Sequence, residues 1–440
     1  MTDKQYESKY KRVGQRYNRK DAQEKVTGQA LYTYDLEFPG MLHARCLFSP
    51  YARAKIVSID TSKAKALPGV RAVLTGEDSD ILVGLYMQDK RALSKGETRY
   101  HGDIVAAVAA VDEDTAERAI SLLDVKYEPL EPVHNVDEAL EAKTLVHDDI
   151  NHLKHIEGVF FPQKDSNIAS WNKSRKGDLD KAFAEADLVV ENEFSLPAVA
   201  HVPMETHVAI VQEDPYSKKI RIWSSAQSPF AIRQIMADSF GISETDVEVH
   251  IPFVGGGFGG KAGIHLEPLA TLLSRAAGGA PVKLRATREA EFNTLPTRAG
   301  MRGRIKSGVT KDGKITAIRV NYDWDSGAYA DYGVNVGKTA VYSGLGPYAV
   351  ENASIDSKTI YTNKVFSTAY RGFGHLETHW SIERQIDILS QKLGIDPYEF
   401  RMKNLLEPGT RTMSGELITE SSGSPKDCLT AVVKEIGWTG

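Results

Sequence analysis

The sequence predicts a mixed fold in which a small α/β domain precedes a larger domain of strands and helices. A chain of 440 residues is too long for one ordinary hydrophobic core, which indicates at least two domains. In the first 130 residues, short apolar strands alternate with short helices, as is typical of α/β domains. From about residue 176 the segments are longer, and a strong hairpin turn joins two of them. We expect domains at 1–130 and 176–440, with a less periodic connector at 131–175.

The first domain contains apolar runs bounded by turn residues or by helix-start signals. The turn Pro68-Gly69 leads the chain into the apolar run 70–74. Asp114-Thr115 begins a helix directly after the apolar run 104–111. Strands are predicted at 41–47, 70–74, 104–111 and 125–127, and helices at 61–66 and 116–123.

In the second domain the hairpin is the clearest local signal. Asp312-Gly313 supports a turn that matches the twist of paired strands, so residues 302–309 and 315–323 should form a hairpin. Ser228 is a plausible N-cap for a helix over 230–240. Further strands are predicted at 188–194, 207–212, 220–224 and 247–253, and helices at 178–183, 265–277 and 379–393.

Composition excludes several classes of protein. With 41% hydrophobic and 26% charged residues and a net charge of -5, the chain is globular and has no basic field for nucleic acid. No apolar stretch approaches the roughly 18 residues of a membrane span, and the polar amino terminus lacks a signal-peptide core. The only cysteines, Cys46 and Cys428, cannot form a disulfide framework or a four-thiolate iron–sulfur site. A cytoplasmic setting is therefore expected.

Two glycine-rich loops carry most of the functional information. They are Val254-Gly-Gly-Gly-Phe-Gly-Gly-Lys261 and Ala369-Tyr-Arg-Gly-Phe-Gly374. So many glycines indicate a backbone that approaches a ligand or adopts positive φ. The first loop follows a strand and precedes a helix, so it could hold an anion on its backbone N–H groups. It fits neither the Walker nor the dinucleotide pattern, and a plain strand-to-helix turn remains the alternative.

Together and in this order, the two loops resemble the cofactor loops of the xanthine dehydrogenase and aldehyde oxidase family. Further segments match both domains of that family in the same order. Those resembling its small "hammerhead" α/β domain are 26–28, Asp35, 39–44, 67–70 and 101–106. Those resembling the first half of its molybdopterin-binding domain are 223–229, the two loops and 396–404.

The resemblance implies a molybdenum centre held by a pterin dithiolene, with oxo, sulfido (or selenido) and hydroxyl ligands. It implies that Gln227 donates a hydrogen bond to the oxo group and that Arg371 borders the centre. Fixed donors and a flat wall would then hold the substrate beside the metal. The implied cofactor-binding residues are Gln227, Gly257, Phe258, Gly259 and Arg371, and the implied substrate contacts are Tyr370 and Phe373. As alternatives, Gln227 could cap the helix near Ser228, and Phe373 could be ordinary core.

Departures from the family pattern narrow the substrate. Purine-oxidising members carry a glutamate where this chain has Ala262, and an arginine near the position of Thr339. The carbon monoxide enzymes carry a cysteine in the second loop, which is absent here. After Gly374 the usual Gly-Pro-Gln is replaced by residues 375–377, His-Leu-Glu. These departures argue against xanthine and carbon monoxide as substrates. The substrate stays open, with an N-heteroaromatic such as nicotinate as the first expectation and an aldehyde as the second.

The chain ends where the first half of the cofactor-binding domain ends in the family. The family's general-base glutamate and its pterin-dinucleotide loops lie in the second half. This resembles the split architecture of nicotinate dehydrogenases, in which two molybdopterin subunits share one active site. We expect three further subunits: a second molybdopterin-binding subunit that supplies the base, a [2Fe-2S] subunit and an FAD subunit. We expect the pterin to be in its cytosine-dinucleotide form. A truncated gene is the alternative. Full activity of this chain alone would instead require a substitute base among Glu205, Glu267 and Glu377.

Two rival hypotheses come from other classes of protein. His375 and His379 are four residues apart on a predicted helix, and His201, Glu205 and His207 form a second cluster. Such groups could bind zinc in a hydrolase, although the metalloprotease signature places its glutamate directly after the first histidine. A catalytically inactive structural subunit is the other rival. The leading hypothesis is a hydroxylase that converts R–H and water into R–OH and passes two electrons to the other subunits.

Overall fold

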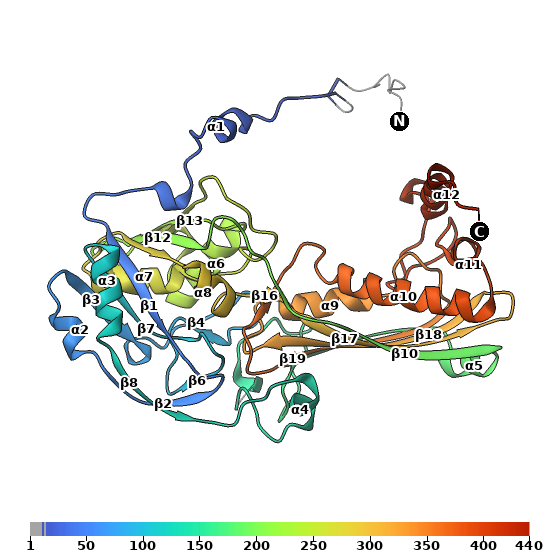
Figure 1. The fold of residues 1–440 in the computed structure, drawn as a ribbon, viewed down its shortest axis with the longest axis horizontal. Helices are drawn as coiled ribbons and strands as arrows, with labels where there is room; N and C mark the ends of the chain where they lie inside the picture. The colour runs from blue at the N-terminus through green and yellow to red at the C-terminus, as the bar shows by residue number, and fades with distance from the viewer. Residues whose placement is uncertain (1–10, 13–14, 149, 440) are drawn as a thin grey trace.

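The computed structural model describes residues 11–12, 15–148 and 150–439. Figure 1 shows a rounded part built around one sheet, joined to an elongated part built around a second sheet. Each sheet has its own large hydrophobic core. Two segments, one carrying α1 (Ala22–Val26) and one carrying α12 (Pro425–Ile436), project on the same side of the molecule. The predicted mixed fold is confirmed.

The rounded part is organised by a seven-stranded sheet to which both predicted domains contribute. Its order is β14-β13-β12-β15-β1-β7-β3, with β1 pairing in parallel with β15 from Leu42↔Val282. Strand β7, which lies between β1 and β3, is buried along its whole length, as its apolar sequence requires. The bounds are β1 Leu42–Phe48, β3 Val70–Thr75, β7 Ile104–Ala110, β12 Val208–Glu213, β13 Ile220–Ser224, β14 Val247–His250 and β15 Val282–Arg285.

Helices cover both faces of this sheet. On one face α3 (Glu113–Ser121) packs on β1 and β7, and the Asp112 side chain accepts a hydrogen bond from the Thr115 N–H at 2.7 Å to cap it. On the other face α7 (Glu267–Ala276) crosses β12, β15 and β3, and its first eight residues are buried. Beside them, α6 (Pro229–Phe240) packs on β14. The chain leaving β14 and the chain entering α7 thereby hold both ends of the first glycine loop.

The elongated part contains a five-stranded sheet of order β10-β17-β18-β19-β9. The predicted Asp312-Gly313 hairpin joins β17 to β18, and α9 (Gly333–Ser343) forms the crossover to the parallel strand β19. In Figure 1, α9 and α10 (His375–Leu393) lie along one face, and α4 and α5 lie below. The bounds are β9 Ile168–Lys176, β10 Leu188–Leu196, β17 Gly300–Val309, β18 Ile315–Gly327 and β19 Asn352–Tyr361.

Smaller elements complete the described chain. One three-stranded sheet contains β2 Ala54–Asp60, β6 Glu97–Thr98 and β8 Asp124–Pro129. A second contains β11 Val199–Ala200, β16 Thr297–Arg298 and β20 Ser367–Thr368. A two-stranded sheet contains β4 Leu82–Val83 and β5 Lys90–Arg91. The remaining α-helices are α2 Ser62–Ala66, α4 Val136–Glu141, α5 Leu179–Ala184, α8 Arg288–Asn293 and α11 Pro397–Asn404. The 3₁₀ helices are Thr33–Asp35, Gly76–Asp78, Ile150–His152, Glu244–Asp246 and Glu420–Ser422.

Several boundaries differ from the sequence expectation. The segment 131–175 contains α4, and β9 begins within it as an edge strand of the five-stranded sheet. The strand before the first loop ends at His250, and α10 begins at His375 instead of His379. Helix α9 was not expected, since its glycines and β-branched residues favour helix poorly. Packing against β18, β19 and α10 selects it. Among the described residues, none of the helices has both the length and the apolar character of a membrane span.

Candidate functional site: the paired glycine loops

The two glycine loops, distant in sequence, lie against each other between the two parts of the molecule. The first loop follows β14, and the second follows β20 and leads directly into α10. The Arg371 N–H donates to the Phe258 carbonyl at 2.8 Å. A Cβ on Gly259 would lie 2.5 Å from the Ala369 carbonyl oxygen. Because any side chain at Gly259 would separate the loops, glycine is required there for their contact.

Each loop holds its phenylalanine in the left-handed backbone region. The φ angles are 54° for Phe258 and 50° for Phe373, a conformation rare for bulky residues. The Phe258 side chain is 45% exposed, whereas Phe373 is half-buried with its ring centroid 6.2 Å from that of Tyr332. Strained, outward-facing aromatic residues in paired loops are typical of ligand sites. The alternative that Phe373 is core holds in part, since it packs on the core of the five-stranded sheet.

The Gln227 side chain is fixed against the first loop. Its Oε1 accepts hydrogen bonds from the Gly259 N–H at 2.9 Å and the Lys261 N–H at 3.3 Å. A Cβ on Gly257 would lie 2.4 Å from Oε1, so glycine is needed for this approach. Two backbone donors fix the amide orientation, leaving the Nε2 amino group as the outward donor with no hydrogen bond in the described part of the chain. Gln227 therefore bonds to the loop and does not cap α6, for which Ser228 is the N-cap residue.

In the second loop, Tyr370 and Arg371 face different surroundings. Arg371 is exposed, and its guanidinium makes no hydrogen bond or ion pair with any described residue. The Tyr370 ring is half-buried between the imidazole of His201, 4.7 Å away, and the guanidinium of Arg298, 5.6 Å away. The structure thus brings all seven predicted site residues to the paired loops, with Arg371 and the Gln227 amino group free to contact a ligand.

A buried ion pair holds the base of the first loop. Lys261 has a fully buried side chain, and its Nζ lies 3.1 Å from Glu205 Oε2, which also accepts the Gly255 N–H at 2.7 Å. Burial lowers the pKa of Lys261, and the Glu205 carboxylate opposes that shift. Glu205 Oε1 is buried without a hydrogen-bond partner. Breaking this pair would leave a buried charge, so the loop is locked at both of its ends.

The predicted zinc clusters are not metal sites in the structure. Glu377 is buried and turns to Arg298, at 3.1 Å between Oε1 and Nε, while the His375 and His379 rings lie 5.4 Å apart. Burial raises the pKa of Glu377. His201 and His207 face backbone carbonyls behind the loops. No group of three or more His, Cys, Asp or Glu side chains in the described ranges is arranged to hold a metal.

The positions that distinguish purine-oxidising enzymes lie beside the loops. Ala262 directly follows the first loop, and its N–H donates to the Gly259 carbonyl at 3.0 Å. Thr339 is buried on α9, where its hydroxyl donates to the Phe373 carbonyl at 2.9 Å. A long side chain at position 339 would therefore have to pass the second loop. Neither residue present here offers a charge to a substrate.

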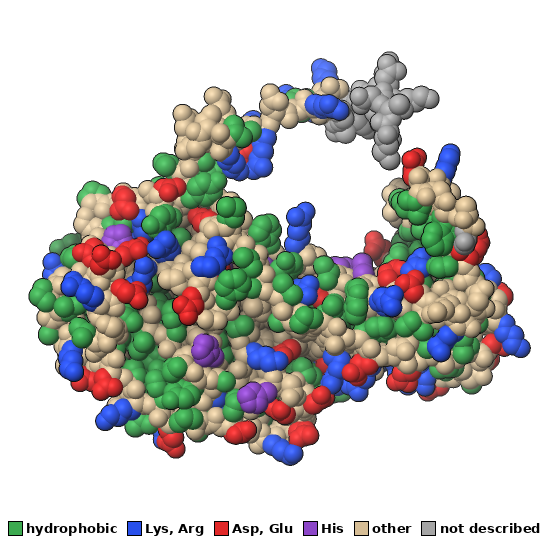
Figure 2. All heavy atoms as spheres, in the orientation of Figure 1, with side chains coloured by type: hydrophobic (Ala, Val, Ile, Leu, Met, Phe, Trp, Pro, Cys, Tyr) green, Lys and Arg blue, Asp and Glu red, His purple; other side chains and the backbone are tan. Residues whose placement is uncertain are grey.

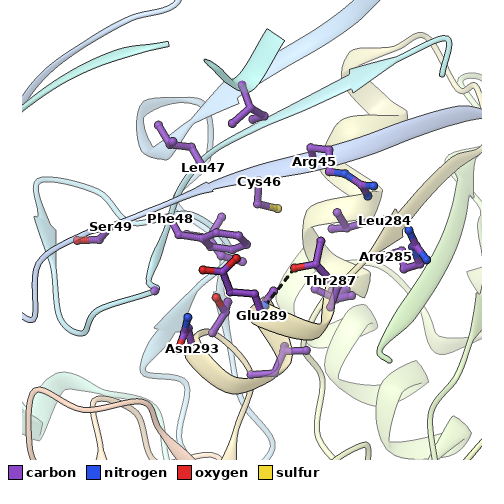
Figure 3. A pocket seen from close by; sticks show the side chains of 18 of the residues that line it. Arg45, Cys46, Leu47, Phe48, Ser49, Leu284, Arg285, Thr287, Glu289 and Asn293 are labelled. Carbon is purple, nitrogen blue, oxygen red and sulfur yellow. Dashed lines mark hydrogen bonds between the residues drawn. The ribbon is translucent and has the colours of Figure 1, made fainter. Parts of the chain in front are cut away.

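A pocket of about 410 Å³ lies away from the glycine loops, between β1, β15 and α8 (Figure 3). Its wall includes Arg45, Cys46, Phe48 and Glu289, and none of its lining residues belongs to either glycine loop. Burial raises the pKa of the Cys46 thiol to about 12, so it is no nucleophile at neutral pH. The unpaired Gln227 amino group and the strained backbone of Phe258 and Phe373 lie at the glycine loops, and we place the functional site there.

Comparison with known proteins gives the same assignment. A family model described as molybdopterin cofactor-binding domain matches residues 160–405, and the aldehyde oxidase and xanthine dehydrogenase a/b hammerhead domain matches residues 27–131. The nicotinate dehydrogenase large molybdopterin subunit of Eubacterium barkeri is 32% identical, over 94% of each chain. The xanthine dehydrogenase molybdenum-binding subunit of Escherichia coli O157:H7 is 33% identical over 96% of this chain and 55% of its own length.

Solved structures share the fold. Quinoline 2-oxidoreductase from Pseudomonas putida 86 superposes with a TM-score of 0.86 and 32% identity, over 96% of this chain and 54% of that one. Carbon monoxide dehydrogenase from Oligotropha carboxidovorans gives a TM-score of 0.88 with 28% identity, over 97% and 54%. The chain thus spans nearly all of the nicotinate dehydrogenase protein but about half of these others.

A hammerhead domain joined to a molybdopterin-binding fold, in which two glycine loops meet, defines a molybdenum-cofactor protein. The chain belongs to the aldehyde oxidase and xanthine dehydrogenase family. The predicted family and the molybdenum–molybdopterin cofactor class are confirmed. The sequence analysis did not identify the partners of Gln227 or the buried side chains behind the loops, because they come together only in the fold.

Proposed function

We propose that this chain is the large molybdopterin-binding subunit of a multi-subunit molybdenum hydroxylase whose active site a second subunit completes. The observation that carries the proposal is the Gln227 amide, fixed by two loop N–H groups with its amino group unpaired among the described residues. When bound, the molybdenum–pterin group supplies the redox chemistry that adds water-derived oxygen to an electrophilic carbon and accepts two electrons. The protein supplies position and electrostatics.

The residues at the paired loops fit such a group. A donor held rigidly before the reaction loses little in reorganisation, which is how fixed amides stabilise developing charge. In this proposal Gln227 donates to the cofactor, and the backbone of Gly257, Phe258 and Gly259 approaches it without side-chain bulk. Arg371 provides an exposed positive charge at its edge. Tyr370 and Phe373 form the wall against which a flat substrate is oriented.

The general base is proposed to lie on another subunit, because the nearby carboxylates are already committed. Glu205 pairs with Lys261. Glu267 accepts the Ser224 hydroxyl at 2.6 Å and two backbone N–H groups. Glu377 is buried against Arg298. A base must reach the proton it removes within hydrogen-bond distance, and none of these three carboxylates is free to do so.

The partner is proposed to cover the loop face of the molecule. Apolar side chains near the loops are exposed, among them Met204, Phe258 and Leu376. Helix α12 exposes Val432 and Ile436, and Figure 2 shows apolar side chains on the projecting segment that carries this helix. Obligate interfaces are broad and apolar. We place the second molybdopterin-binding subunit on this face, and the contacts to the cytosine dinucleotide on that subunit. Further subunits would carry the [2Fe-2S] cluster and FAD. The proposed location of the complex is the cytoplasm.

An N-heteroaromatic compound is the proposed substrate. Ala262 and Thr339 provide no charged anchor for a purine, while Tyr370 and Phe373 offer aromatic surface. Two similar proteins are named for nicotinate and quinoline. An aldehyde is the second candidate, supported by the similarity to an aldehyde oxidoreductase from Desulfovibrio gigas at 26% identity and a TM-score of 0.84.

Metal and nucleotide analysis of the native complex tests the proposal. The complex purified through this chain should contain molybdenum in near-stoichiometric amount and release cytosine monophosphate on acid hydrolysis of its pterin. Stoichiometric zinc without molybdenum would contradict the proposal and favour a hydrolase.

A further inference from the structure

Three buried histidines lie directly behind the paired glycine loops, and each faces a loop carbonyl. His201 Nε2 lies 2.8 Å from the Ala369 carbonyl oxygen, at the start of the second loop. His207 Nε2 and His265 Nε2 lie 3.1 Å and 3.0 Å from the same oxygen, that of Gly260 in the first loop. The cluster that suggested zinc in the sequence is thus part of a backbone support.

His265 has one proton, and its position follows from the contacts. Burial, together with the charges of His207 and Lys90, lowers the pKa of His265 well below its usual value, so the ring is neutral. Its Nδ1 is buried without a hydrogen bond and lies 3.8 Å from Asp331 Oδ2. The single proton therefore belongs on Nε2, where it is donated to Gly260.

Both ring nitrogens of His207 face oxygen acceptors. Its Nδ1 lies 2.8 Å from Glu291 Oε1, and its backbone N–H donates to the same oxygen. Burial opposes ionisation of Glu291, but the hydrogen bond and charge of His207 outweigh it, and the pKa of Glu291 is lowered. Glu291 is then a carboxylate that accepts the His207 backbone N–H, and His207 is held with its Nε2 against the Gly260 carbonyl oxygen. That oxygen lies beside two imidazole rings, and His265 is its donor.

These two histidines lie against one end of the peptide group whose other end holds Gln227. The Gly260 carbonyl and the Lys261 N–H belong to a single planar peptide unit. Its oxygen faces His207 and His265, and its N–H donates to Gln227 Oε1 at 3.3 Å. Fixing the carbonyl on the buried side thus fixes the N–H that orients the Gln227 amide on the exposed side.

Asp331 extends the support to the second loop. Its Oδ1 accepts the hydroxyl of Thr368 at 2.8 Å, and Thr368 directly precedes that loop. Its Oδ2 faces His265. A Cβ on Gly263 would lie 2.7 Å from the Asp331 carboxylate, so the chain after the first loop is packed against the same group.

We propose that His207 and His265 are positioning residues that orient the Gln227 amide through the peptide between Gly260 and Lys261, and that Asp331 and His201 align the second loop with it. The role in turnover rests on the proposed function, whereas the effect on the loops does not. A buried hydrogen bond that is lost leaves the carbonyl unsatisfied, and this should loosen both loops while the cofactor can still bind.

Backbone hydrogen exchange in the purified complex tests the proposal, with His265→Leu compared with His265→Gln. Leucine removes the donor, whereas the glutamine amide can replace Nε2. In His265→Leu, exchange at Gly259, Lys261 and Arg371 should accelerate about tenfold, as expected for the loss of about one buried hydrogen bond. In His265→Gln it should stay near the wild-type rate. Turnover should fall in His265→Leu at unchanged KM and molybdenum content.

His147→Leu is the matched control, because His147 is also buried and bonds a carbonyl, that of Ala328 at 2.7 Å, outside the loops. It should leave loop exchange unchanged. Should His265→Leu not fold, Thr368→Val removes only the hydroxyl on Asp331 and should accelerate exchange at Arg371. Wild-type exchange in the folded test variant, or equal acceleration in His147→Leu, would overturn the proposal. Hydrogen exchange is measured on backbone amides and does not need the metal. A complex without molybdenum would therefore contradict the proposed function, but the exchange test of the loop support would still be valid.

Discussion

The buried and exposed sides of the paired loops differ in how many of their polar groups have partners within the chain. The buried side is crowded with hydrogen-bonded and charged groups, including the Lys261–Glu205 pair and three histidines. The exposed side carries Phe258, Arg371 and the Gln227 amino group, with few contacts to the rest of the chain. A buried polar network fixes geometry, whereas unpaired exposed groups are available to a ligand. Substitutions on the two sides should therefore fail in different ways.

The largest effect is expected on the buried side, for Lys261→Met. The substitution leaves the Glu205 carboxylate buried without its partner, which typically costs about 3–5 kcal/mol of stability. Denaturant unfolding of the purified complex measures it. Lys364→Met is the matched control, because Lys364 pairs with Asp325 at the surface at 2.6 Å and should change stability by less than about 1 kcal/mol. Equal losses in both variants would contradict the distinction between the two sides.

On the exposed side, Gln227→Ala should impair turnover far more than it lowers stability. Loss of one fixed donor of this kind typically lowers kcat by about two orders of magnitude. The Gly259 and Lys261 N–H groups lose their acceptor, so stability should fall by at most about 1–3 kcal/mol, less than for Lys261→Met. Steady-state kinetics and calorimetry on the same preparation separate the two effects. A large loss of melting temperature with a proportionate loss of activity would mean that Gln227 is mainly structural.

A smaller effect on the same side is expected for Arg371→Ala. Its guanidinium contacts no described residue, so stability should stay within about 0.5 kcal/mol of wild type. Turnover should still fall, because the charge lies beside the proposed cofactor position; the decrease should be smaller than for Gln227→Ala, since no fixed hydrogen bond is lost. Arg384→Ala, an exposed arginine on α10, should leave turnover unchanged. Wild-type kinetics for Arg371→Ala would remove this residue from the site.

Much of this arrangement could be predicted from the sequence. The glycine pattern and the Asp312-Gly313 turn are local signals, and the structure contains both loops and the hairpin. The resemblance to a known family supplied Gln227, Phe258 and Arg371, which composition and periodicity alone do not indicate. Such signals lie within a few residues of each other, and local sequence determines them.

The rest depends on contacts between distant segments. Strand β1 joins the seven-stranded sheet beside β15, and β9 pairs with β19, although neither pairing leaves a local pattern. His265 and Asp331 meet only because α7 and the β18–α9 connection pack at the same border. His201 and His207 were noticed as a cluster, but their spacing suggested zinc. Their carbonyl partners on the loops lie far away in sequence.

Reconstitution of the active site tests the central claim most directly. This chain, expressed alone, should be inert in hydroxylase assays, because the nearby carboxylates Glu205, Glu267 and Glu377 are committed to other partners. Co-expression with the second molybdopterin-binding subunit should restore turnover. A base in position contributes about two to four orders of magnitude, so the gain should be at least that large. Full turnover by the isolated chain would contradict the account.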